Sequence, residues 1–195
     1  MSGADEEGGA KMRTLVLGMG CILMRDDGVG PSALAAFEAL YEVPAEVELL
    51  DIGTPGPELA HIIGGYDALI VFDALRVQSP PGTVRCLTRS EILAAPLLNP
   101  RLSPHDPGLR EALLSAQFFG AAPREVLLVG VVPQEIELGT ELSRAVTAAL
   151  PRAAAAAAEE LLRLGIQAIP RAQPTLARVW WQQTPTAALG EERPG

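Results

Sequence analysis

The sequence is poor in cysteine, aromatic residues and basic residues. Its two cysteines, Cys21 and Cys86, do not form a CxxC motif, which argues against a disulfide framework or a structural zinc site. Aromatic residues make up only 4% of the chain, so the core must be built from Leu, Val, Ile and Ala. The 15 basic residues face 24 acidic ones, for a net charge of -9. That balance disfavours a broad nucleic-acid surface, because phosphate binding needs clustered Lys and Arg.

Long apolar runs are also missing. None approaches the roughly 20 residues needed to cross a bilayer, and the acidic start of the chain lacks the apolar segment of a secretory signal. We therefore expect a cytoplasmic protein with no membrane and no nucleic-acid partner. A length of 195 residues favours one domain. We predict a flexible leader at 1–12, a single α/β domain at 13–170, and a tail at 171–195 that carries two tryptophans.

Strand-like and helix-like segments alternate along the predicted domain. Continuous apolar runs indicate strands buried on both faces, and the alternation predicts a mainly parallel sheet with right-handed crossovers. Gly165 is expected to end the last helix. The expected strands are 14–17, 46–50, 67–72 and 125–131, with an edge strand at 83–87, and the expected helices are 31–40, 57–63, 109–119 and 143–164. The helix at 109–119 would place Leu109, Leu113, Leu114 and Phe118 along one side.

Two adjacent carboxylates, Asp26 and Asp27, follow the first strand in the segment 18–30, GMGCILMRDDGVG. The segment looks like the start of a dinucleotide-binding fold, but a pyrophosphate would need bare amides and positive potential at this place. Carboxylates at the end of a strand suit a metal, a proton transfer or a cationic partner. The alternative is capping of the next helix, and the two residues can divide these roles.

Two later residues can converge with the acidic turn. Asp73 ends an apolar strand, where the alternative role is to start a turn. His105 lies in a loop before a helix, where a capping or partly buried histidine is an equal alternative, and His61 is assigned no function. Ligands bind at the carboxyl ends of such strands. Asp27, Asp73 and His105 would form an open site of oxygen and nitrogen ligands, suited to nickel or zinc.

Cys21 allows a different chemistry. With His105 it could form the nucleophile and base of a cysteine peptidase. No local cysteine-peptidase signature surrounds it, and a small buried residue beside a tight turn is the simpler interpretation.

Taken together, these motifs resemble the hydrogenase maturation proteases, which process the large subunit of nickel-iron hydrogenases. The resemblance runs from about residue 13 to residue 170 and depends on the order and spacing of five motifs. These are the 18–30 turn, DIGTPG at 51–56, FDA at 72–74, SPH at 103–105 and LVGVVP at 128–133. The family commonly has Asn where this chain has Cys21, and two glycines where it has Ile52 and Gly53.

The resemblance implies a three-layer fold, a twisted and mainly parallel sheet between helices. It implies an aspartic-type endopeptidase that removes the C-terminal extension of the nickel-loaded large-subunit precursor. The nickel is then supplied by the precursor and contacted by Asp27, Asp73 and His105, which would also be the catalytic residues. The Asp51 turn matches a segment also linked to processing in the family. We expect the enzyme to be a monomer.

Two other functions are alternatives to the endopeptidase. The protein could be a nickel-dependent checkpoint that holds the precursor without cutting it. It could also be a nucleotide-binding domain, although the paired acids after Arg25 argue against that.

Overall fold

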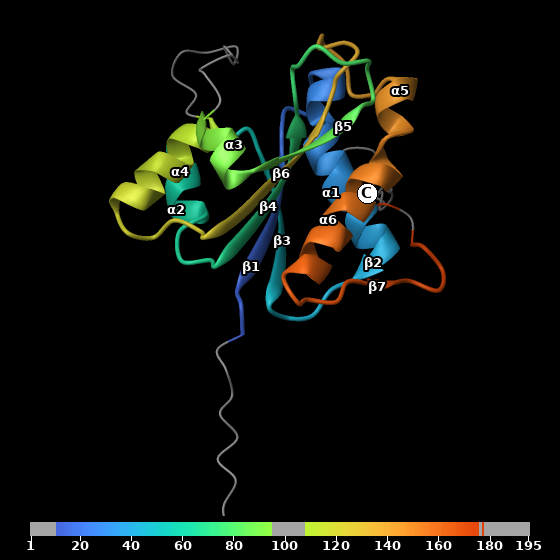
Figure 1. Cartoon of the computed structure of the whole chain (residues 1–195). Coiled ribbons are helices and arrows are strands. Elements are labelled where there is room, and N and C mark those ends of the chain that lie inside the picture. The colour runs from blue at the N-terminus through green and yellow to red at the C-terminus, as the bar shows by residue number, and fades with distance from the viewer. Residues whose placement is uncertain (1–10, 95–107, 176, 178–195) are drawn as a thin grey trace, which may run out of the picture.

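A five-stranded sheet lies between two layers of helices (Figure 1). The computed structural model describes residues 11–94, 108–175 and 177. The strand order is β3-β1-β4-β6-β5, with β5 antiparallel to β6 and the other pairs parallel. The bounds are β1 (Thr14–Met19), β3 (Val47–Gly53), β4 (Ala68–Ala74), β5 (Val84–Thr88) and β6 (Glu125–Val131). The predicted fold class is confirmed, including the edge strand.

The central strands are apolar on both faces because helices cover both faces. All six residues of β1 and the first five of β4 are buried, as expected for parallel strands inside an α/β sheet. One face is covered by α1 (Val29–Leu40) and α6 (Leu150–Arg163). The other face is covered by α2 (Leu59–Ile62), α3 (Arg89–Ala94) and α4 (Leu109–Phe118). Figure 1 shows the two groups of helices on opposite sides of the sheet.

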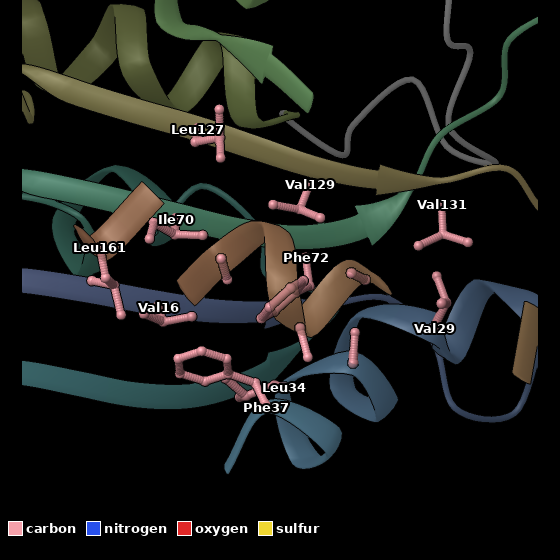
Figure 2. Close-up of a cluster of buried hydrophobic side chains, with 14 of the residues drawn as sticks. Val16, Val29, Leu34, Phe37, Ile70, Phe72, Leu127, Val129, Val131 and Leu161 are labelled. Carbon is pink, nitrogen blue, oxygen red and sulfur yellow. The ribbon is translucent and has the colours of Figure 1, made fainter. Parts of the chain in front are cut away.

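Alternate side chains of each strand pack into two separate cores, since successive residues of a strand point to opposite faces. Val16, Ile70 and Phe72 point toward α1 and α6, where they meet Phe37 and Leu161 (Figure 2). Phe37 is fully buried, and its ring centroid lies 6.3 Å from that of Phe72. The neighbouring residues of the same strands pack against α2 and α4.

A second, two-stranded sheet joins the end of α1 to the chain after α6. It pairs β2 (Tyr41–Glu42) with β7 (Ile169–Pro170) in antiparallel fashion. Arg171 follows, and its guanidinium donates to the Glu38 carbonyl and the Glu42 carboxylate. The start of the predicted tail therefore contacts α1, whereas its two tryptophans lie outside the described residues.

The single helix predicted at 143–164 is wrong, because the structure has two helices. The first, α5 (Arg144–Thr147), ends just before α6 begins at Leu150. Pro151 is the reason: it lacks an N–H, and its ring clashes with the carbonyl four residues earlier in a continuous helix. It is tolerated in the first turn of α6.

The inward face predicted for α4 is also partly wrong. Leu109 and Leu113 are buried, but Leu114 and Phe118 are exposed. The buried face of α4 also contains two alanines, Ala112 and Ala116. Together with the two leucines they fit the i, i+3, i+4, i+7 spacing of a helix face.

Sheet topology places the candidate site. From β1 the chain goes to β3 on one side and then to β4 on the other side. Strand order therefore reverses at β1, and a crevice forms at the carboxyl ends of the strands on either side of such a point. Asp27 follows β1 and Asp73 lies at the end of β4, so both belong to this edge.

Candidate active site

Glycines bring the acidic turn against the ends of two strands. A Cβ added to Gly30, at the start of α1, would lie 1.9 Å from the Met19 carbonyl oxygen and 2.5 Å from that of Phe72. A Cβ on Gly20, where φ is +132°, would lie 1.9 Å from the Asp27 carbonyl oxygen. Only glycine permits such close backbone approach. The turn is therefore packed directly onto the ends of β1 and β4.

Asp27 is half-buried and is held by the turn itself. One oxygen of its carboxylate accepts the backbone N–H of Cys21 at 2.8 Å, and its own N–H donates to the Met24 carbonyl at 3.1 Å. These bonds fix the orientation of the carboxylate. It does not cap α1, whose N-cap is Gly28 and has no side-chain cap bond.

Asp73 lies on the neighbouring strand, one residue past Phe72. It is the sixth of the seven residues of β4 and pairs in register with Gly130 of β6. Its Oδ1 accepts the following N–H, of Ala74, at 2.8 Å. Since Gly30 abuts the Phe72 carbonyl, the structure brings Asp27 and Asp73 to the same edge of the sheet, as the sequence predicts.

Asp26 has a different role from its neighbour. It is fully buried, and its carboxylate accepts four hydrogen bonds from the 134–143 segment. Oδ1 accepts the Ser143 N–H at 2.6 Å, while Oδ2 accepts the N–H groups of Gln134 and Glu135 and the Ser143 hydroxyl. The capping role considered for Asp26 is wrong: it joins the turn to a segment more than 100 residues away. Ser143 in turn caps α5.

Arg25 strengthens the same junction. Its φ is +46°, its N–H donates to the Gly139 carbonyl at 2.8 Å, and its guanidinium forms ion pairs with Glu135 and Glu137. Sequence reasoning missed this function of Arg25 and of the 134–143 segment. The only available signal was a lone basic residue beside two acids, because its partners are distant in the sequence.

Comparison with known proteins identifies the family. The profile described as hydrogenase maturation protease matches residues 32–160. The chain is 38% identical over 161 residues to "Hydrogenase 2 maturation protease" of Escherichia coli K12. The aligned residues cover 82% of this chain and 97% of that protein. The chain belongs to the hydrogenase maturation protease family. The predicted family and its endopeptidase activity are confirmed.

Solved structures agree with this assignment. The hydrogenase maturating endopeptidase HybD from E. coli superposes with a TM-score of 0.75 at 38% identity, over 82% of this chain and 98% of that one. HybD from Thermococcus kodakarensis superposes with a TM-score of 0.60 at 31% identity, over 77% of this chain and 99% of that one. HycI from the same archaeon, at 22% identity and a TM-score of 0.61 over 79% and 95%, shares the fold.

The first departure from the family pattern is Cys21, which lies beside Asp27 in the acidic turn. Its backbone N–H orients the Asp27 carboxylate, a bond that depends on the main chain and not on the thiol. Cys21 is half-buried and is not in a disulfide. The base of the cysteine-peptidase alternative, His105, lies outside the described residues, so both interpretations of Cys21 stay predictions.

The second departure lies in the Asp51 segment. The turn predicted from 51 onward begins later, because β3 continues through Gly53. Asp51 pairs with Gly18 of β1, and its Oδ1 accepts the Gly53 N–H at 3.1 Å. Gly53 has a φ of +55°, and Ile52 packs against the α2–α4 core. Beyond this loop, the Gly56 N–H lowers the pKa of exposed Glu58 by bonding its carboxylate.

The third predicted ligand, His105, lies outside the described residues, so the complete set of Asp27, Asp73 and His105 stays a prediction. Among the described residues, no group of three or more His, Cys, Asp or Glu side chains could hold a metal ion. His61 is exposed on α2. No helix in the described part of the chain is long and apolar enough to cross a membrane.

Proposed function

We propose that this endopeptidase removes the C-terminal extension of the large-subunit precursor of a nickel-iron hydrogenase, after nickel has been inserted into the precursor. Membership of the maturation protease family supports the reaction. The joint position of Asp27 and Asp73 supports recognition of a metal ion, because both carboxylates lie at the switch point of the sheet.

Nickel is part of the substrate in this proposal. Carboxylates brought together repel one another, and a cation relieves that repulsion. A loaded precursor would bring a cation to Asp27, Asp73 and His105, whereas an empty one would not. The carboxylate of Asp27 is already oriented by the Cys21 amide, which limits the reorganisation needed on docking.

The chemical step is hydrolysis of one peptide bond. A carboxylate of the site or the His105 imidazole takes a proton from water as general base. The water oxygen bonds to the scissile carbonyl carbon, the C–N bond breaks, and the proton passes to the leaving amine. A metal ion bound next to that carbonyl would polarise it as a Lewis acid.

We also assign the enzyme to the cytoplasm as a monomer that acts alone on its precursor. Light scattering on the purified protein, and fractionation of cells that express it, test these two assignments.

The deciding experiment compares nickel-loaded and nickel-free precursor. Each is incubated with the purified protein and analysed by intact mass. Cleavage of the loaded form alone, with release of a C-terminal peptide, is expected. Cleavage of both forms would overturn the metal requirement. Nickel-dependent binding without cleavage would favour the checkpoint function. Neither binding nor cleavage of a folded, cognate precursor would overturn the proposed substrate.

A further inference from the structure

Two exposed leucines lie side by side next to the acidic turn. Leu23 is 58% exposed and Leu138 is 84% exposed. The next residues, Met24 and Gly139, form a parallel β-bridge, and the Gly139 N–H donates to the Leu23 carbonyl at 3.0 Å. Each leucine directly precedes a residue of this bridge, so the two exposed side chains come from adjacent backbone segments. They are called here the leucine pair.

The backbone beneath the leucine pair is held rigidly. Asp26 ties the turn to the 134–143 segment through its four hydrogen bonds. The Arg25 side chain packs against Gly139, since a Cβ added to Gly139 would lie 3.0 Å from Arg25 Cγ. Its guanidinium also pairs with Glu135 and Glu137. A surface of this kind loses little conformational entropy on binding, which is the advantage of a preorganised interface.

The leucine pair is continuous with the proposed site. Leu23 lies in the turn from Cys21 to Met24, and both ends of that turn bond to Asp27: the Cys21 N–H donates to its carboxylate and the Met24 carbonyl accepts its N–H. A substrate segment that contacts Asp27 therefore passes next to the leucine pair.

From this geometry we infer that the leucine pair is a docking surface for the hydrogenase precursor, and this inference rests on the proposed function. Exposed Glu141 lies three residues after Leu138, and exposed Glu137, which pairs with Arg25, directly precedes it. The whole chain carries a net charge of -9. The occupant is a segment of the precursor with apolar side chains between basic residues. The metal contact reports that the precursor is loaded, and the leucine pair supplies binding energy that does not depend on the metal.

The test measures kcat and KM for cleavage of nickel-loaded precursor by wild type, Leu138→Ser and Leu23→Ser. Burial of one leucine contributes enough binding free energy to change affinity about tenfold. Each serine variant is expected to raise KM by about tenfold with kcat unchanged, since the contact is the same in ground and transition states. Leu138→Met, which keeps an apolar side chain, is expected to keep KM within about twofold of wild type.

Phe118→Ser is the matched control. Phe118 is 86% exposed, but it lies at the end of α4. The chain that follows α4 contacts the loop before β4, because the Gly65 N–H donates to the Ala121 carbonyl. This end of α4 therefore lies near the amino ends of the strands, on the side opposite the candidate site. Its KM should not change. Unchanged KM in both leucine variants, with active wild type, would overturn the docking surface alone. An equal rise in KM for Phe118→Ser would overturn it as well, because the effect would then not be local. Inactive wild type on authentic loaded precursor would overturn the proposed function and this inference with it.

Discussion

Two neighbouring regions of this protein are built from one acidic turn, and each uses an aspartate in a different way. In the first region, Asp26 is fully buried and its carboxylate accepts hydrogen bonds from the 134–143 segment. In the second, Asp27 is half-buried, bonds to one local amide and lies at the strand ends together with Asp73. Adjacent carboxylates thus divide into one that stabilises the fold and one that contacts the substrate in the function proposed above.

The difference shows why residue type alone does not identify a site. A carboxylate with its oxygens occupied by backbone amides in the interior has no capacity left for a ligand. A carboxylate at a topological switch point has both access and neighbours of the same charge.

The largest expected effect is on catalysis at the strand ends. Asp73→Asn removes a charge from the proposed metal contact, so processing should fall by at least about 100-fold, with the melting temperature near that of wild type. Intact mass of nickel-loaded precursor measures the first quantity and calorimetry the second.

Glu38→Gln is the control for loss of a carboxylate, since Glu38 is exposed on α1. It should process precursor at the wild-type rate. Full activity in a correctly folded Asp73→Asn protein would remove Asp73 from the site.

The next effect tests whether the two strand ends must stay in contact with the turn. Gly30→Ala places a Cβ against the carbonyl oxygens of Met19 and Phe72, both of them backbone atoms that cannot rotate away. We expect a loss of about 3 kcal/mol in the free energy of unfolding, measured by urea denaturation, and reduced activity in the folded fraction.

Gly64→Ala is the comparison for that variant, because the nearest atom to its Cβ would be the His61 carbonyl oxygen at 3.3 Å. A much smaller loss is expected there. Equal stability of Gly30→Ala and wild type would show that the turn does not pack on β4 as described.

A smaller effect separates Asp26 from Asp27. Asp26→Asn leaves buried amides of the 134–143 segment facing an NH₂ group, which should cost about 2 kcal/mol of folding free energy. The folded enzyme should keep most of its kcat. Asp27→Asn should do the opposite, with kcat lost and stability nearly preserved. If Asp26→Asn lost activity without losing stability, the division between the two regions would be wrong.

The smallest effect is expected at Cys21. Cys21→Ser keeps the backbone N–H that binds Asp27, so activity should stay within about twofold of wild type. Rates are compared for the variant and for wild type treated with a thiol alkylator. Loss of activity in Cys21→Ser with an intact fold would instead support the cysteine-peptidase interpretation.

Local patterns predicted most of the fold. The apolar runs of β1, β4 and β6 correspond to strands, because a strand buried on both faces has no polar position. The predictions failed where a distant or opposing effect decided the outcome. Pro151 split an alanine-rich helix that propensity alone would continue, and packing selected Ala112 and Ala116 over Leu114 and Phe118 for the inner face of α4.

The candidate site was partly predictable in the same way. Asp27 and Asp73 each follow an apolar strand, and parallel strands end at one edge, so their proximity follows from order along the chain. The roles of Asp26 and Arg25 did not, because their partners are more than 100 residues away.

The sequence by itself determined the alternation of strands and helices and the family, since these depend on local periodicity and on motifs in a fixed order. Only the tertiary structure decided which of two adjacent aspartates is buried and which exposed leucines lie beside the site. Hydrogen bonds and contacts between segments far apart in the chain set those properties, and they exist only once the sheet has assembled.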